Sequence, residues 1–310
     1  MDIRQLRYFL GILHAKSVTK AAETLRVAQP ALGLQIRNLE RELGVQLLVR
    51  HARGVAPTEA GTLLARHAES IVRMFERAQQ DLVDYGKTPR GRVSLGMSMT
   101  AAHVLVGPLA DRCRRKFPAV QLTLTEGLSR QLIQRIAADD LDIALMFHPH
   151  DHPELVRKPL IDEPLMFVRP AGNDRLPPAI NLPELFKHEL VLPSRPHLMR
   201  EIAETAALES GQSLRLFCEA DAVTTMIELV RRGLAQTLLP LAVVKTEVDN
   251  REIRVQRVNS ENFRRTLYIV HSDKRPQTKA SEAVYREVVA LAQELARDGD
   301  VDWALPRVPR

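Results

Sequence analysis

The sequence is poor in cysteine, aromatic residues and glycine, and each shortage excludes a class of protein. Its two cysteines, Cys113 and Cys218, lie far apart and form neither a disulfide framework nor a CxxC motif. Both fall in apolar stretches, so we expect buried free thiols. Aromatic residues account for 4% of the chain, with a single tryptophan, which leaves the cores to Leu, Val, Ile and Ala. Only 14 of the 310 residues are glycine, and no glycine-rich phosphate-binding loop is present.

Long hydrophobic runs are missing as well. No stretch reaches the roughly 18 apolar residues that a membrane span requires. The N-terminal MDIRQLRYFL lacks the basic start and apolar core of a signal peptide. We therefore expect a cytoplasmic protein without a membrane partner, and its length suits two or three domains.

Positive charge is present and is concentrated near the N-terminus. The formal net charge is +6, and the first 60 residues carry nine Lys or Arg against five acidic residues. A basic balance of this kind points to a polyanionic partner, although it is weak evidence alone.

Residues 3–43 show the spacing of three short helices. Ile3, Leu6, Phe9, Leu10 and Leu13 recur at helical intervals, Ser17 can cap a second helix, and Val27-Ala28 forms a turn. Pro30 suits the first turn of a third helix, whose inner stripe is Leu32, Ile36, Leu39 and Leu43 and which ends at Gly44. The pattern predicts a helix-turn-helix, whose second helix enters the DNA major groove.

The outer face of that third helix carries the candidate DNA contacts Gln29, Pro30, Gly33, Leu34 and Arg37. Glutamine can bond adenine, and arginine can bond guanine or phosphate. The following LLVRHARGVAPTEAG predicts a wing of two strands, where Arg50 and Arg53 can reach DNA and an arginine can enter a narrow minor groove. The alternative is a structural three-helix module with a solvated charged face, and the basic excess favours DNA binding. This module spans residues 1–58.

A long helix is predicted over residues 59–88. Apolar residues alternate steps of four and three along it, which favours a partner helix and hence a dimer: Leu64, Ala68, Ile71, Phe75, Ala78, Leu82 and Tyr85. The alternative is that this seam packs on its own domain.

Residues 89–310 alternate strands and helices. Their first run, strand-helix-strand-helix-strand with a helix over about 104–116, predicts α/β folding with a parallel sheet, and a second set of strands and helices follows. The elements form two sets, so we expect lobe I at about 89–164 and 265–296, lobe II at about 165–264, and a frayed tail from Arg297. Ligands of such sheets bind beyond the carboxyl ends of the strands. The candidate effector contacts there are Ser98, Thr100, Ser129, Phe147, Ser194, Arg195, His197 and Thr224. Hydroxyls, helix amides, one arginine and one histidine suit a small carboxylate; the alternative for each Ser or Thr is a helix cap.

Enzyme and metal functions find little support. GMSMT around Ser98 is not a GxSxG nucleophile elbow, because Thr100 replaces the second glycine. His148, His150, Asp151 and His152 lack the usual zinc spacing, so we expect a solvated loop, with zinc as the alternative. We expect no cofactor, no metal and no catalytic residues. A pure solute-binding protein would need an export signal and would not need the N-terminal helices.

Several stretches closely resemble the LysR-type transcriptional regulators over residues 2–296: AAETLRVAQPALGLQIRNLERELGVQLLVR, PTEAG, LTEG with Ser129, LDIALMF and LVRRGLAQTLLP. The resemblance implies an α+β multidomain protein with a winged helix-turn-helix, a long linker helix and a two-lobed α/β effector domain like the periplasmic binding proteins. It implies tetramers built from paired dimers, promoter DNA as the target, contact with RNA polymerase and a small effector bound between the lobes.

The matching major-groove positions are Gln29, Pro30, Gly33, Leu34 and Arg37. This chain has Ala28 where many members have serine, and Gly33 and Leu34 where polar or basic residues are common. These departures predict weaker hydrogen-bond readout, with Leu34 able to contact a thymine methyl group.

Overall fold

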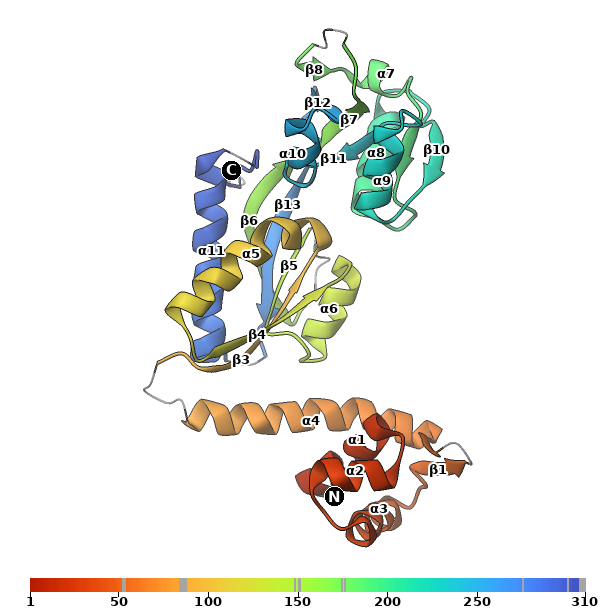
Figure 1. Cartoon of the computed structure of the whole chain (residues 1–310), viewed down its shortest axis with the longest axis vertical. Helices are drawn as coiled ribbons and strands as arrows, with labels where there is room; N and C mark the ends of the chain where they lie inside the picture. Colours follow the sequence, from red (N-terminus) through yellow and green to blue (C-terminus); the bar gives the residue numbers. More distant parts are fainter. Residues whose placement is uncertain are drawn as a thin grey trace. The chain divides into compact units, whose positions relative to one another are not determined.

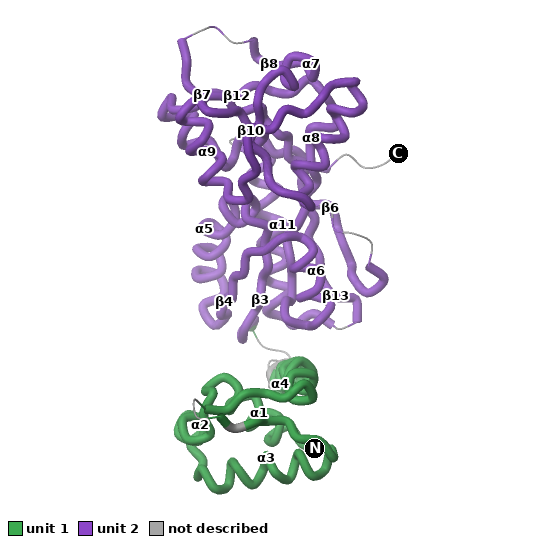
Figure 2. Tube along the Cα trace, turned by 90° about the vertical axis from the view of Figure 1, so that its right-hand side faces the viewer, with its two compact units in different colours: residues 1–88 green, residues 89–310 purple. Residues whose placement is uncertain are grey.

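The computed structural model describes residues 1–51, 54–83, 88–147, 149, 152–173, 175, 177–274, 276–299 and 301–306, apart from the side chains of Arg50, Arg77, Gln80, Asp81 and Val83. The chain divides into two compact units, Met1–Thr88 and Pro89–Arg310 (Figure 2). Every helix in the described part of the chain is too short or too polar to span a lipid bilayer.

The first unit contains α1 (Ile3–Ala15), α2 (Val18–Leu25), α3 (Gln29–Leu43), the antiparallel pair β1 (Leu48–His51) and β2 (Gly54–Pro57), and α4 (Glu59–Val83). The predicted start and stop signals are confirmed. The Ser17 hydroxyl accepts a hydrogen bond from the Lys20 amide at 3.4 Å, and Pro30 lies in the first turn of α3. Gly44 ends α3 in the left-handed conformation that glycine adopts most easily. Leu32, Ile36 and Leu39 are buried as expected, whereas Leu43 is exposed.

The long helix α4 begins where Thr58 caps it, with the Thr58 hydroxyl accepting from the Gly61 amide at 2.9 Å. The predicted apolar seam divides into two parts. Ala68 is buried in the core of the first unit and Leu64 packs against it, so this half of the seam covers its own domain. Further along, Ile71, Phe75 and Leu82 are exposed. Tyr85 lies outside the described residues.

In the second unit, a five-stranded sheet runs in the order β4-β3-β5-β13-β6. Its strands are β3 (Gly91–Met97), β4 (Val120–Glu126), β5 (Ile143–Phe147), β6 (Leu155–Pro164) and β13 (Arg264–Ser272). β3 is parallel to β4 and β5, as predicted for these three strands, but β13 is antiparallel to both β5 and β6, so the whole sheet is mixed and differs from an all-parallel one. The difference arises because β13 returns to this sheet from the second set of elements.

Helices cover both faces of this sheet (Figure 1). α5 (Met99–Lys116) and α11 (Lys279–Asp298) pack on one face, and α6 (Ser129–Ala137) packs on the other. α5 begins at Met99, not at about Val104 as predicted, because Ser98 already has the extended conformation of an N-cap. We call this sheet with its three helices the first lobe.

The second lobe contains β7 (Met166–Pro170), β8 (Ala179–Ile180), α7 (Leu182–Leu185), β9 (Leu190–Leu192), α8 (Leu198–Glu209), β10 (Leu216–Glu219), α9 (Val223–Arg231), β11 (Thr237–Leu239), α10 (Leu241–Asp249) and β12 (Ile253–Val258). Four strands are ordered β11-β7-β12-β8, and the parallel pair β10-β9 joins them through a bridge between Leu190 and Gln236. The chain crosses between the lobes twice, from β6 to β7 and from β12 to β13.

The tail after α11 differs from the prediction that it frays. Trp303 is 4% exposed and belongs to the first-lobe core. Ala304 forms an antiparallel bridge with Asp162 of β6 through two backbone hydrogen bonds of 2.8 and 2.9 Å. Burial of the large indole ring fixes a segment whose composition otherwise suggests a free end.

Candidate functional site

The outward face of α3 presents the predicted DNA contacts together. Gln29, Pro30, Leu34 and Arg37 are exposed, and Gly33 is half-buried between them. The N-cap is Ala28, whose methyl group cannot accept a hydrogen bond from the first turn. Main-chain amides at a helix N-terminus attract phosphate, so this end of α3 combines a polar side chain at Gln29 with an anion-friendly backbone.

The wing is fastened to α3 by one carboxylate. Glu40 Oε1 accepts hydrogen bonds from the backbone amides of Leu47 at 2.8 Å and Leu48 at 3.2 Å. The wing also meets the start of α2, because the Val55 amide donates to the Lys16 carbonyl at 3.0 Å. A pocket of about 480 Å³ lies between α3 and the wing, lined in part by Gly33, Arg37 and Val55. Of the predicted wing contacts, the side chain of Arg50 and all of Arg53 lie outside the described residues.

In the first lobe, four predicted effector contacts meet at the carboxyl ends of β3, β4 and β5. Ser98 is the N-cap of α5, and its buried hydroxyl has no hydrogen-bond partner among the residues that the structure describes. Ser129 opens α6 and donates to the Phe147 carbonyl at 2.8 Å. Thr100 and Phe147 are both buried, and each of them contacts a fifth residue, Arg265.

Arg265 is the functional candidate that the sequence did not reveal. It lies in β13, is 3% exposed, and donates from Nη2 to the Thr100 hydroxyl at 2.6 Å. Its guanidinium carbon lies 3.7 Å from the centre of the Phe147 ring, a cation–π distance. Glu163, at the end of β6, balances its charge with Oε2 2.7 Å from Arg265 Nε. The sequence does not reveal Arg265 because a charged residue inside a strand belongs to no local motif. Residues that follow the end of a strand can be located from the strand pattern itself.

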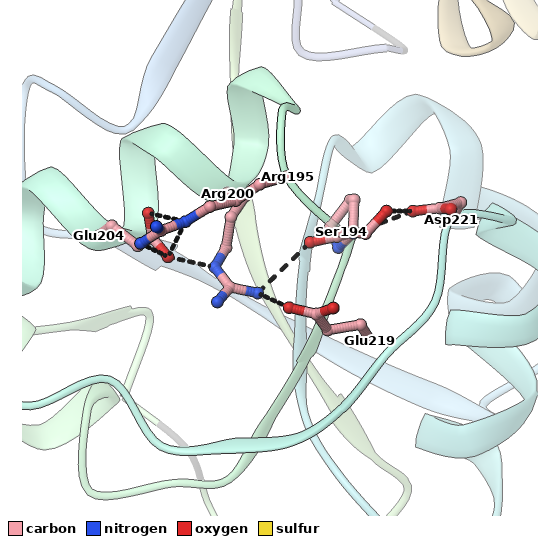
Figure 3. A network of polar contacts seen from close by, with 7 residues as sticks. Ser194, Arg195, Arg200, Glu204, Glu219 and Asp221 are labelled. Carbon is pink, nitrogen blue, oxygen red and sulfur yellow. Dashed lines mark hydrogen bonds and ion pairs between the residues drawn. The ribbon is translucent and has the colours of Figure 1, made fainter.

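The second lobe contributes a loop between β9 and α8 (Figure 3). The Ser194 hydroxyl and backbone amide both donate to Asp221 Oδ1, at 2.6 and 2.9 Å. These two hydrogen bonds, the hydroxyl's first, hold the pKa of Asp221 below its usual value. Arg195 is exposed and forms an ion pair with Glu204, with Nη2 and Oε1 2.8 Å apart.

Beside that pair, the buried Arg200 contacts two carboxylates. Arg200 Nε lies 2.5 Å from Glu204 Oε1, and Nη1 lies 2.9 Å from Glu219 Oε1 (Figure 3). The predicted cation Arg195 therefore belongs to a network in which carboxylates already balance both arginines. Thr224 is exposed in the first turn of α9, next to the Ala222 N-cap.

His197 stands at the start of α8 in the second lobe. It caps α8, with Nδ1 accepting from the Met199 amide at 3.2 Å. Burial lowers the pKa of His197, and the positive charge of Arg265 lowers it further, while Asp221 acts in the opposite direction. Arg265 of the first lobe therefore acts on the pKa of a histidine in the second lobe.

Seven of the eight predicted contacts therefore fall into two sets, and Thr224 lies apart from both on α9. Ser98, Thr100, Ser129 and Phe147 share one strand edge, and Ser194, Arg195 and His197 share one loop. The described residues contain no group of three His, Cys, Asp or Glu that could hold a metal ion. His148, His150 and Asp151 lie outside them, so zinc binding by this loop stays an open alternative.

Two family descriptions match the chain. Residues 3–62 match "Bacterial regulatory helix-turn-helix protein, lysR family", and residues 86–293 match "LysR substrate binding domain". The nitrogen assimilation regulatory protein nac of Klebsiella aerogenes is 34% identical over 247 residues, which are 79% of this chain and 80% of that protein. The HTH-type transcriptional regulator BbuR of Bordetella bronchiseptica is 29% identical over 303 residues, covering 95% of this chain and 92% of that one.

Among solved structures, full-length CbnR complexed with its target DNA is similar with a TM-score of 0.71 and 19% identity. The match covers 95% of this chain and 99% of that chain. At this identity the likeness establishes the fold alone. The fold expected from the sequence, a helix-turn-helix unit joined to a two-lobed α/β domain, is confirmed.

Proposed function

The chain belongs to the LysR family of bacterial transcriptional regulators, and on this premise we propose how its two units bind DNA and a small effector. It is a DNA-binding regulator with an effector-binding domain, not an enzyme.

The first unit reads promoter DNA with the outer face of α3. Gln29 and Arg37 supply polar contacts, Leu34 meets a thymine methyl group, and Pro30 and Gly33 allow close approach of the helix. Arg50 and Arg53 of the wing contact the backbone or the minor groove. The exposed row along α3, with the wing tied to it by Glu40, carries this proposal. Such a regulator works in the cytoplasm, where the chromosome lies.

The second unit binds a small carboxylate between its lobes. Ser98 supports this proposal most directly, because its buried hydroxyl lacks a partner among the described residues and stands at the N-terminus of α5. Thr100, Ser129 and Phe147 stand at the same strand edge, with Arg265 in contact with Thr100 and Phe147. Ser194, Arg195, His197 and Thr224 supply the contacts of the second lobe in this proposal.

Dimers form through the exposed apolar residues of α4, and tetramers form from paired dimers. The exposed Ile71, Phe75 and Leu82 support the first step. The resemblance to the family supports the second step and contact with RNA polymerase.

Two experiments test the proposal separately. Purified full-length protein is incubated with fragmented genomic DNA of its source, and bound fragments are sequenced at low and at physiological ionic strength. Enrichment of discrete promoter fragments supports DNA reading by α3 if Arg37→Ala reduces it; uniform recovery of all fragments contradicts it. A thermal-shift screen then compares small carboxylates with their amides. Stabilisation by a carboxylate that disappears in Ser98→Ala supports the site, and hits confined to amides or amines contradict the effector class.

A further inference from the structure

The single tryptophan of the chain lies in its C-terminal tail and is buried. Gly299 ends α11 with φ of 75° and turns the chain back. Trp303 then enters the first-lobe core, and its indole Nε1 donates to Glu163 Oε1 at 2.8 Å. The backbone of Ala304 pairs with Asp162 in the next position. We call residues 301–306 the C-terminal strap.

Glu163 links Trp303 to Arg265, which contacts the candidate effector residues of the first lobe. Its side chain is 1% exposed, and each of its oxygens has a different partner: Oε1 accepts from Trp303, and Oε2 accepts from Arg265. A buried carboxylate with two separate partners has little freedom to rotate, because rotation would leave one donor unpaired. The indole N–H therefore determines where Oε2 lies.

Arg265 completes the connection. It is held by Glu163 on one side and donates to Thr100 on the other, with its guanidinium over Phe147. Both Thr100 and Phe147 are candidate effector contacts. The tail and the effector site are thus joined by an unbroken series of buried polar contacts from Trp303 to Thr100.

The C-terminal strap also contacts the second lobe. Asp302 Oδ1 lies 2.6 Å from Arg257 Nη2, and Arg257 belongs to β12. Glu163 stands just before the crossing from β6 to β7, and Arg265 follows the crossing from β12 to β13. The strap therefore binds both lobes at the two connections on which any change in their mutual orientation depends.

We propose that Trp303 is a positioning residue for the effector site, acting through Glu163 on Arg265, and that a change at Thr100 is transmitted back to the C-terminal strap. The second statement follows from the first, since coupling between two sites is reciprocal. The proposal rests on the proposed function for the meaning of the site, but the coupling is a property of this unit alone. A purely structural tryptophan would affect global stability without this directed effect.

The first experiment uses Trp303 as its own reporter in the full-length protein. Thr100→Val removes the hydroxyl that accepts from Arg265, and Thr246→Val makes the same chemical change at an exposed position of α10. We expect Thr100→Val to shift the tryptophan emission and raise its quenching by acrylamide at least two-fold, while Thr246→Val leaves both unchanged. Unchanged emission in folded Thr100→Val overturns the proposal; Arg265→Lys provides a second perturbation of the same contact.

The second experiment works in the opposite direction by hydrogen–deuterium exchange. Trp303→Phe keeps a buried ring but removes the N–H donor, and Leu305→Ala alters an exposed residue of the same strap. Exchange in the first turn of α5 and at the end of β5 should rise several-fold in Trp303→Phe only, with β10 unaffected. A uniform rise across the unit, or none, contradicts a positioning role.

Neither experiment contains DNA or effector. Failure of the proposed function would leave both readouts intact, and failure of the coupling would leave DNA binding intact, so the two ideas are judged separately.

Discussion

One oxygen of Asp221 accepts both hydrogen bonds that Ser194 can donate, from the hydroxyl at 2.6 Å and from the backbone amide at 2.9 Å. This is the arrangement that a bound carboxylate would adopt at such a loop. The bonds lower the pKa of Asp221, which is therefore ionised at neutral pH. A carboxylate effector has to displace this internal anion or bind beside it.

The first prediction follows from that competition. Asp221→Asn removes one negative charge beside Ser194, so a carboxylate identified by the thermal-shift screen should bind more tightly. A unit charge about 4 Å away contributes about 1 kcal/mol in a water-like medium, which corresponds to roughly a five-fold change in Kd. Isothermal titration calorimetry measures it. Asp249→Asn, on the exposed face of α10, removes an equal charge and should have no effect. Weaker binding by Asp221→Asn would contradict the prediction. It would show that the support Asp221 gives to the Ser194 loop contributes more to binding than its charge repulsion opposes it.

DNA binding should depend on Arg37 in one of two distinguishable ways. If Arg37 bonds a guanine, Arg37→Ala should cost about 1–3 kcal/mol at one base position and relax specificity there. If it contacts phosphate, affinity should fall for all sequences and the slope of log K against log salt should lessen by about one. Fluorescence anisotropy at several salt concentrations separates these outcomes. Arg215→Ala, which removes an exposed arginine of the second unit, is the control. Equal losses of DNA affinity in both variants would mean that Arg37 acts only through the net positive charge of the protein.

The free half of α4 gives a prediction about assembly. Met74 is 60% exposed and Leu82 is 78% exposed, which is unusual for large apolar residues on one helix. Met74→Glu should weaken the proposed dimer by about 3 kcal/mol for its two copies, or about 100-fold in Kd. Sedimentation velocity measures the change. Gln79→Glu adds the same charge at an exposed polar position, and a dimer equally weakened by both variants would argue against an apolar α4 interface.

The sequence predicted the first unit well because its signals are local. Ser17, Pro30 and Gly44 mark helix ends through the chemistry of their own backbones, and the structure places those ends at the same residues. Most strands of the second unit were also found, β6 and β8 excepted, since apolar runs bounded by turns identify strands. Which of their side chains touch could not be predicted in this way.

The remainder depends on contacts between distant residues. Glu163 and Arg265 are 102 positions apart, and neither stands in a motif. The segment Leu155–Pro164 contains two prolines and several charges, so its pattern does not suggest a strand, yet β13 pairs with it along its length. In the sequence, Trp303 looks like part of a polar tail, and only the folded structure shows that it belongs to the first-lobe core. Each is fixed by tertiary packing that overrides local preference.

A final prediction concerns pH and His197. Burial and the nearby Arg265 lower the pKa of His197 in the folded chain, so the unfolded chain takes up this proton first as the pH falls. The contribution of His197 to stability is therefore complete above its unfolded pKa of about 6.5 and declines as the pH falls below that value. Protonation also conflicts with its cap, because Nδ1 must accept from the Met199 amide.

His197→Asn tests this reasoning, since asparagine caps helices well and does not titrate. At a pH of about 7.5 the melting temperatures of the variant and the wild type should be close, whereas at about 5.5 the wild type should have lost more. The difference between the two proteins, measured by calorimetry in the same buffers, cancels the titration of the other histidines. A constant difference across the range would mean that His197 keeps its ordinary pKa, and that Arg265 lies too far away or is too well neutralised by Glu163 to affect it.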